Sequence, residues 1–191
     1  MRFNRHDLAG ISVAIQGLGS VGMALAEMLH KAGAKIIAHD IDQARMDYAA
    51  RALGADIVDA DALYDVDAQV FAPCALGAVL NDETIPRLKV DIVAGAANNQ
   101  LTAARHDAML AEKGIFYAPD YLVNAGGVIS VAYEYFARTG RNPFDHPADH
   151  EHMMAHAGRI GPALESVYQD AQSSGRSSGV CADERAEALI Y

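Results

Sequence analysis

The stretch Ile11-Ser-Val-Ala-Ile-Gln-Gly-Leu-Gly-Ser-Val-Gly22 decides the fold. Its first six residues form a short, β-branched, apolar run, which predicts a strand buried on both faces of a parallel sheet. Three glycines follow with the spacing G-x-G-x-x-G, and apolar residues then recur at helical spacing from Ser20 to Ala32. A strand, a glycine turn and a helix in this order indicate a dinucleotide-binding unit.

Each glycine of the turn has a physical reason to be glycine. Gly17 permits the tight turn, Gly19 lets a pyrophosphate approach the backbone, and Gly22 lets the helix pack close to the sheet. The helix N-terminus offers free amides to the phosphates. A glycine turn without a ligand is the alternative. The residues predicted to hold the pyrophosphate are Gly17, Leu18, Gly19, Ser20, Val21 and Gly22.

An acidic residue ends the second predicted strand. Asp40 comes eighteen residues after Gly22 and is predicted to accept hydrogen bonds from the adenosine ribose, with Ile41 beside it in the cofactor site. A carboxylate there repels a 2′-phosphate, which favours NAD over NADP; no arginine follows directly, and Arg45 falls inside the next predicted helix. The alternative is that Asp40 only ends a strand, whereas Asp42 is predicted to cap the helix that follows.

The rest of the chain repeats the alternation of strand and helix. The further predicted strands are 35–39, 56–58, 69–72, 90–94 and 115–118, and the helices between them include 42–53 and 105–113. We therefore predict an α/β fold, a doubly wound, mostly parallel Rossmann sheet with extra C-terminal helices. Residues 1–145 are the expected dinucleotide-binding domain and 146–191 a helical extension packing on it. The helices expected after the sheet are 125–138, 151–172 and 182–190, with a flexible connector at 173–179.

Composition excludes several classes of partner. The net charge is −10, from 25 acidic and 15 basic residues, which argues against nucleic acid and against an anionic membrane. No stretch of about 18 apolar residues occurs, so a cytoplasmic location is the default expectation. The two cysteines form no CxxC pair and no metal is expected, although His152 and His156 have the i, i+4 spacing of a shared metal site.

Three further segments, 72–77, 94–100 and 118–127, lie at predicted carboxyl ends of strands, where α/β sheets bind ligands. Together with the glycine turn, they resemble the carboxyl-terminal, NAD-binding domain of the leucine/phenylalanine/valine dehydrogenases of the Glu/Leu/Phe/Val family. The resemblance extends over about residues 7–190. Members of that family reversibly deaminate an L-amino acid to its 2-oxo acid and ammonia with NAD. For this chain the resemblance implies an apolar, leucine-like substrate.

The resemblance also implies roles for residues outside the glycine turn. Asn99 is expected to reach substrate and nicotinamide, and Asn124 the carboxamide. Val128 and Val131 are expected to line the substrate side-chain pocket, with ordinary core packing as the alternative for both. Nothing near Cys74 supplies a base, so it is not predicted to be a nucleophile. The residues expected at the nicotinamide ribose are Cys74, Ala75 and Leu76.

No catalytic residue is predicted in this chain. The family's acid–base lysine belongs to an amino-terminal domain, and we expect that domain to be absent here; the only lysines are Lys31, Lys35, Lys89 and Lys113, at ordinary helix or strand-edge positions. The chain alone is therefore expected to bind NAD(H) without turnover. The amino acid and 2-oxo acid would bind together with the missing domain, and a homo-oligomer is one alternative for the assembly.

Two other classes stay open at this stage. One is an NAD-binding sensor module without chemistry, and the other is an inactive relative. The terminal helices discriminate between the sensor and the dehydrogenase half. In a dehydrogenase half they pack toward the other domain and leave an apolar patch exposed, whereas in a sensor they are covered or form a symmetric dimer.

Overall fold

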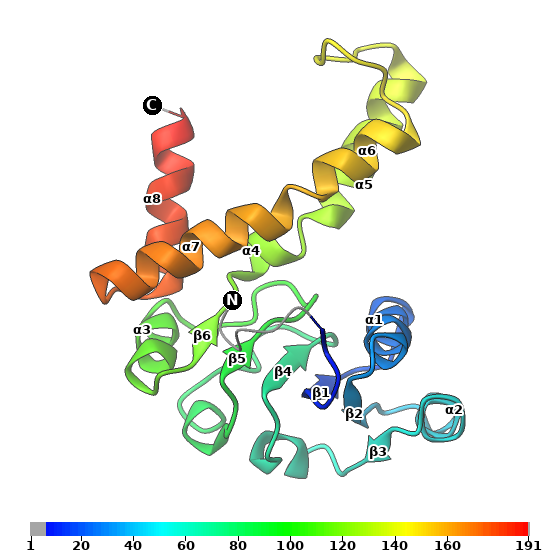
Figure 1. Cartoon of the computed structure of the whole chain (residues 1–191), viewed down its shortest axis with the longest axis vertical. Helices are drawn as coiled ribbons and strands as arrows, with labels where there is room; N and C mark the ends of the chain where they lie inside the picture. Colours follow the sequence, from blue (N-terminus) through cyan, green and yellow to red (C-terminus); the bar gives the residue numbers. More distant parts are fainter. Residues whose placement is uncertain (1–6, 191) are drawn as a thin grey trace.

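A computed structural model describes residues 7–190 and places six parallel strands in one sheet with the order β3-β2-β1-β4-β5-β6 (Figure 1). This confirms the predicted α/β, doubly wound parallel fold. The order changes direction between β1 and β4, which is the place where such sheets bind nucleotides. The strands are β1 (Ser12–Gln16), β2 (Lys35–His39), β3 (Asp56–Ile57), β4 (Val70–Pro73), β5 (Ile92–Val93) and β6 (Phe116–Tyr117).

The two faces of the sheet carry separate cores. On one face, α1 (Ser20–Lys31) and α2 (Gln43–Leu53) bury the side chains around Val13 and Ile15. On the other face, α3 (Arg105–Glu112) and two short 3-10 helices cover a core that contains Phe71 and Val93. The 3-10 helices are η1 (Ala62–Asp65) and η2 (Ile85–Arg87). Adjacent positions along a strand point to opposite faces, which is why Val13 and Ala14 belong to different cores.

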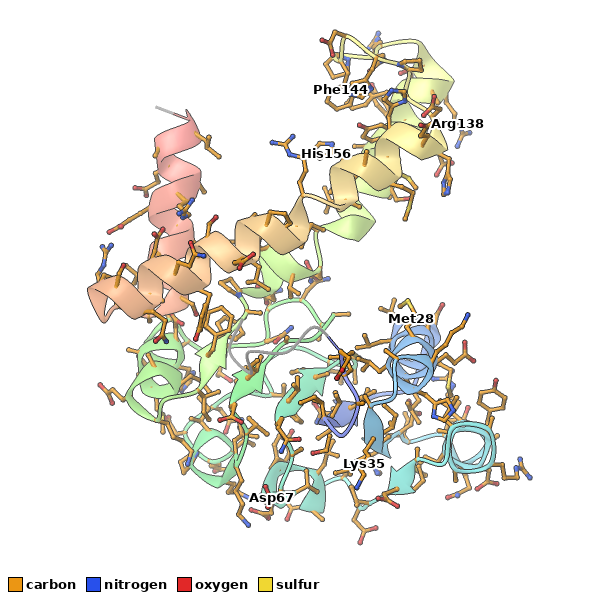
Figure 2. All side chains as sticks on the ribbon, viewed as in Figure 1. Met28, Lys35, Asp67, Arg138, Phe144 and His156 are labelled. Carbon is orange, nitrogen blue, oxygen red and sulfur yellow. The ribbon has the colours of Figure 1, made fainter. Side chains whose placement is uncertain are left out.

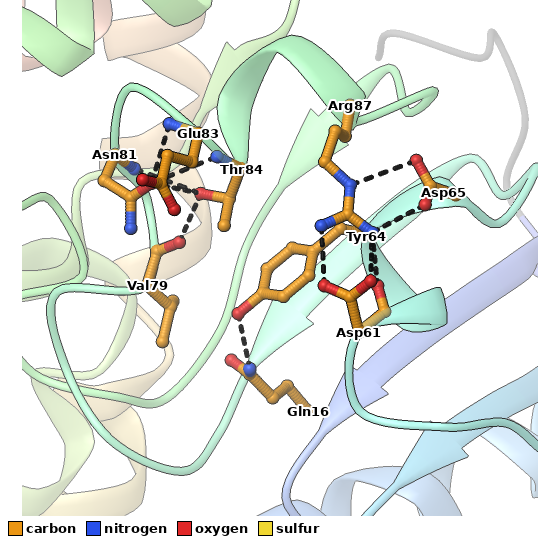
Figure 3. Close-up of polar contacts among 9 residues, drawn as sticks. All are labelled: Gln16, Asp61, Tyr64, Asp65, Val79, Asn81, Glu83, Thr84 and Arg87. Atoms are coloured by element: carbon orange, nitrogen blue, oxygen red, sulfur yellow. Dashed lines mark hydrogen bonds and ion pairs between the residues drawn. The ribbon is translucent and has the colours of Figure 1, made fainter.

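A polar cluster fixes the connection from β3 to β4 (Figure 3). The Arg87 guanidinium binds the carboxylates of Asp61 and Asp65 at 2.7 and 2.6 Å. Its Cζ atom lies 5.6 Å from the centroid of the Tyr64 ring, and the Tyr64 hydroxyl accepts a hydrogen bond from Gln16 Nε2 at 2.8 Å. The cluster therefore ties η2 to η1 and η1 to the end of β1.

The C-terminal helices leave the sheet and return to it. In Figure 1, α5 and α6 extend away from the sheet, α7 runs back toward β6, and α8 packs against the end of α7. No helix within the described residues is long and apolar enough to span a bilayer. The elements are α4 (Asp120–Val123), α5 (Gly126–Thr139), α6 (His150–Ala157), α7 (Ile160–Ser174) and α8 (Ser178–Ile190).

Two predictions in this region are wrong. The single helix expected over 151–172 is two helices that separate at Gly158, and Pro162 lies in the first turn of α7, where its missing N–H costs no hydrogen bond. The connector expected over 173–179 is shorter than predicted, because α7 continues to Ser174, Gly175 ends it with φ of +70°, and Ser178 already begins α8, so only residues 175–177 lie outside the helices. Helix α5 packs against α6 across the predicted boundary at 145, and the division into two domains stays a prediction.

Candidate nucleotide-binding site

The glycine turn joins β1 to α1 at the carboxyl edge of the sheet. Gly17 has φ of +96°, a conformation that other residues rarely adopt, and its amide donates to His39 O at 2.8 Å. A Cβ atom at Gly22 would lie 2.0 Å from Gly17 O, so no side chain fits there. The structure thus requires glycine at both positions for the reasons expected from the sequence. Binding of phosphate stays a prediction.

The open side of the turn suits an anion. Helix α1 begins at Ser20 and has no acidic residue in its first turn. Ser20 and Val21 are exposed, whereas the Leu18 side chain is buried in the core. A Cβ atom at Gly19 would meet nothing within 4 Å except Arg45 Nη1, at 3.8 Å. The first amides of a helix lack intrahelical acceptors and carry a partial positive charge, so this end of α1 has the features that the predicted phosphate site requires.

Asp40 closes the turn from the neighbouring strand. Its carboxylate is 6% exposed and accepts hydrogen bonds from the amides of Leu18, at 2.5 Å, and Asp42, at 2.8 Å. Burial raises the pKa of Asp40, but the amides of Asp42 and Leu18 and the charge of Arg45 outweigh burial, so the pKa lies below its ordinary value. Asp40 therefore stays ionised and also organises the loop. Ile41 beside it is 99% exposed.

Arg45 reaches back from α2 to this corner, a role that was not predicted although its i, i+3 spacing from Asp42 was available. Its Nη1 lies 3.8 Å from Asp40 Oδ2, and its Nε lies 3.3 Å from Asp42 Oδ2. Asp42 also caps α2 as expected, because its Oδ1 accepts the Ala44 amide at 2.9 Å. A cation thus lies beside the carboxylate that was expected to repel a 2′-phosphate.

The loop after β4 packs directly on the glycine turn. A Cβ atom at Gly17 would lie 2.7 Å from Ala75 Cβ, so the two segments approach as closely as backbones allow. Burial raises the pKa of the Cys74 thiol, and a hydrogen bond with the Ala96 backbone offsets only part of that rise. A thiol held in its neutral form is a poor nucleophile. Leu76 points outward and is 80% exposed.

The loop after β5 lies against the loop after β4. Ala78 N donates to Asn99 O at 2.7 Å, and both residues have positive φ, +59° and +51°. A Cβ atom at Gly77 would lie 2.4 Å from Asn98 O. The Asn124 amide, from the end of α4, donates to Asn98 Oδ1 at 2.7 Å. The structure therefore brings all three predicted loops together, and Asn124 contacts Asn98 while the Asn99 side chain is exposed.

Two residues that received no predicted role hold these loops in place. Asp120 Oδ2 accepts the Gln100 amide at 2.9 Å, and its Oδ1 accepts the Tyr121 amide at 2.7 Å. The Gln100 side chain is fully buried and donates to Gly95 O and Ala97 O. Both residues lie inside the segments 94–100 and 118–127. The sequence offered one signal for the role of Asp120, because an acidic residue directly after Ala118-Pro119 begins a helix at the carboxyl end of a strand.

The two valines expected in a substrate pocket lie on α5. Val128 is 74% exposed and Val131 is 67% exposed, so neither is a core residue. The alternative of ordinary core packing is wrong for this chain. Their role in a substrate pocket stays a prediction.

All four lysines of the sequence lie far from this edge of the sheet. Lys35 begins β2, Lys31 ends α1, and Lys113 follows α3, so each sits at the amino edge of the parallel strands. Lys89 lies opposite Asp67 in a parallel bridge before β5. Figure 2 shows Lys35 and Asp67 on the side of the sheet away from α5 and α6. No lysine of this chain can therefore act at the glycine turn.

The histidines of the C-terminal region stack instead of gathering round an ion. The His146 ring lies between Phe144, at 4.9 Å, and His152, at 4.5 Å. His152 Nδ1 contacts Asp149 Oδ1 at 2.7 Å, whereas His156 Nδ1 faces the Tyr133 hydroxyl at 3.5 Å. Within residues 7–190, no three His, Cys, Asp or Glu side chains are placed to hold a metal. The pair His152 and His156 thus has separate partners.

Comparison with known proteins identifies the family. Residues 39–188 match the family described as Glutamate/Leucine/Phenylalanine/Valine dehydrogenase. The leucine dehydrogenase of Thermoactinomyces intermedius is 46% identical over 188 residues, which are 98% of this chain and 49% of that protein. The chain belongs to this family. The phenylalanine dehydrogenase of Bacillus thermotolerans is 40% identical over 195 residues, which cover the whole chain and 48% of that protein.

Solved structures of the dehydrogenase family agree with the fold. The crystal structure of L-tryptophan dehydrogenase from Nostoc punctiforme matches with a TM-score of 0.90 and 38% identity, over 99% of this chain and 55% of that one. A hetero-hexameric glutamate dehydrogenase from Thermus thermophilus has a TM-score of 0.69 at 23% identity, over 95% of this chain and 46% of that one, and shares the fold. The chain thus spans about half the length of the family members that it matches.

Proposed function

We propose that this chain is the NAD-binding half of an amino-acid dehydrogenase that oxidatively deaminates an apolar, leucine-like L-amino acid to its 2-oxo acid and ammonia, reversibly. The observation that carries the proposal is the glycine turn, in which Gly22 leaves no room for a side chain and the anionic Asp40 lies directly beside it. Membership of the dehydrogenase family supplies the reaction class. Leucine dehydrogenases among the relatives, together with exposed Val128 and Val131, favour an apolar substrate.

The residues of this chain would hold and orient the cofactor. Bound NAD supplies the hydride acceptor. The amides of Gly19, Ser20 and Val21 would hold the pyrophosphate, because the start of α1 is free of acids and Gly19 is open to solvent. Asp40 would accept hydrogen bonds from the ribose hydroxyls with the lone pairs that its two backbone donors leave free.

The three loops at the carboxyl edge would form the nicotinamide side. Cys74, Ala75 and Leu76 would line the ribose, and the amides of Asn99 and Asn124 would face the carboxamide and the substrate. Their backbones are fixed by Asp120 and by the bond from Ala78 N to Asn99 O, so these loops would need little ordering when the cofactor binds. Because all four lysines lie at the opposite edge, the acid–base group would come from outside this chain.

An apolar opening on one face of the sheet favours a dehydrogenase half over a sensor module. The opening has a volume of about 790 Å³ and is bounded on one side by α7, one of the terminal helices. A sensor module was expected to cover these helices or to form a symmetric dimer through them. We further propose a cytoplasmic location, and we retain a homo-oligomer as the expected assembly, to be measured by light scattering.

Fluorescence titration with NADH tests the cofactor proposal. We expect the fluorescence of NADH to change as it binds, and the change to saturate at micromolar NADH. NADPH should bind more weakly, because Asp40 is ionised. An Arg45→Gln variant should weaken NADPH more than NADH, since Arg45 is the only cation within 4 Å of Asp40 among the described residues. A chain that binds neither cofactor would refute the proposal. Substantial leucine-dependent NAD reduction by the isolated chain would refute the expected need for an external catalytic group.

A further inference from the structure

An apolar groove lies on one face of the sheet and borders the glycine turn at Val21. Its floor is formed by strand residues such as Val13, Val70 and Ile92, and its cavity measures about 790 Å³. The walls are α1 and α7. All but two of its lining residues are uncharged, and the two are acidic, Asp7 and Glu165.

The topology explains why this face is open. Crossovers between parallel strands are right-handed, so the connections that run from β1 through β2 to β3 and those that run from β4 through β5 to β6 lie on opposite faces. Helices α1 and α2 therefore cover the first face only over the β1–β3 half. Helix α7 covers the outer strand of the other half, where Tyr168 packs edge-on against Phe116 at 5.0 Å. Strands β4 and β5 have no helix on that face among the described residues.

Helix α1 carries an apolar stripe that the described chain covers only in part, at Leu25. Val21, Leu25 and Met28 fall on one side of the helix and all line the groove. Val21 is 60% exposed and Met28 is 63% exposed, which is unusual for the apolar side of a helix that packs on a sheet. Figure 2 shows Met28 on the side of α1 that faces the C-terminal helices.

The opposite wall is equally apolar. Pro162 and Leu164 line the groove from the first turns of α7, and Gly161 beside them has no side chain. Neighbouring strands are about 4.8 Å apart and a helix with its side chains is about 10 Å across, so the open width over β4 and β5 equals one helix. The groove thus has the width and the apolar lining that the binding of a single helix requires.

We propose that this groove binds one amphipathic α-helix contributed by the part of the dehydrogenase family members that this chain does not span. The relatives are about twice as long as this chain, so each has a further segment of comparable length from which the helix would come. The helix would present an apolar stripe of about three to four turns, with lysine or arginine toward Glu165. The inference concerns docking and does not require that the chain binds NAD.

Tiled peptides test this interface. Synthetic 20-residue peptides covering the half of the Thermoactinomyces intermedius leucine dehydrogenase outside the match would be titrated against the whole 191-residue chain by fluorescence anisotropy. One overlapping set with an apolar stripe and basic flanks should bind, and amide exchange should slow in α1 and α7. Met28→Glu should weaken that peptide at least tenfold. Leu189→Glu, at a residue on α8 that is 90% exposed and lies outside the groove, should leave binding unchanged.

The outcomes separate clearly. No binding by any peptide, or equal binding to the Met28→Glu chain, would overturn the proposal. A dimer of this chain that Met28→Glu dissociates would assign the groove to a second copy and would also overturn it. Circular dichroism checks that the Met28→Glu chain folds. As a second test, Ala24→Trp places a large side chain in the groove at another position and should also weaken peptide binding. NADH titration of the same samples is the separate readout, since peptide binding without NADH binding would refute the proposed function alone.

Discussion

Two regions of the molecule are packed in opposite ways. One is the turn between β1 and α1, and the other is the arm formed by α5, α6 and their connection (residues 126–157). At the turn, a Cβ atom added to Gly17 or Gly22 would clash with its neighbours, and the Asp40 carboxylate is buried with both oxygens bonded. In the arm only Tyr133 is buried, and Gly126 and Gly127 would meet nothing if a Cβ were added. The turn is tightly packed and hydrogen-bonded, whereas the arm presents an open surface. Substitutions of the same kind should therefore have different effects in the two regions.

The largest effect is expected for Gly22→Ala at the turn. Its new Cβ would lie 2.0 Å from Gly17 O, and a backbone atom cannot move aside as a flexible side chain can. We expect the free energy of unfolding to fall by about 1–3 kcal/mol, as for other overpacked sites, and NADH binding to be lost. Urea denaturation and NADH titration measure the two effects.

Gly127→Ala is the matched control in the arm. Its Cβ would meet nothing within 4 Å, and alanine in a helix is favoured over glycine by about 0.5–1 kcal/mol, so this variant should be slightly more stable. Equal destabilisation by the two substitutions would show that the comparison between turn and arm is wrong.

Asp40→Ala should give the next largest effect on binding. The loss of a charged hydrogen-bond acceptor costs about 1.5–3 kcal/mol, which corresponds to roughly a ten- to hundredfold weaker Kd for NADH. Stability should also fall, because the amides of Leu18 and Asp42 lose their acceptor. Asp149→Ala, which removes the N-cap of α6 in the arm, should leave the NADH affinity unchanged. Unchanged NADH affinity in Asp40→Ala would favour the alternative of an inactive relative.

The pH dependence of stability should show the same carboxylate. The folded state holds the pKa of Asp40 below its ordinary value of 3.8, so its contribution is present in full above that value. As the pH falls through the folded pKa, the contribution is lost. The difference in unfolding free energy between the native chain and Asp40→Asn should therefore be constant from pH 5 to 8 and shrink below about pH 4. A difference that grows on acidification would contradict the cause assigned here.

The sequence predicted the turn far better than its surroundings. The strand and the three glycines are consecutive in the sequence, and Asp40 ends the next predicted strand. Local steric and charge arguments are therefore enough to predict them. Gln100 and Asp120 act through a contact between segments twenty residues apart, which no spacing rule reports. Arg45 lies three residues after Asp42, a spacing at which helical side chains meet, and this local signal was missed. The break between α6 and α7 was missed because Gly158 and Pro162 weaken a helix or begin a new one equally well on sequence alone. The groove was not predicted, because the apolar side of α1 has the same residue pattern as a helix face that packs in the core.

The smallest effect is expected for Val131→Asp in the arm. Because this side chain is 67% exposed, an aspartate there stays hydrated and should change the free energy of unfolding by no more than about 0.5 kcal/mol. NADH affinity should also be unchanged, since the residue lies on α5 and not at the glycine turn. Tyr133→Ala, at a buried residue two positions away, is the contrasting variant and should lower the melting temperature clearly. A marked loss of stability in Val131→Asp would mean that the arm packs against another surface in solution, and the open face described for it would then be an interface.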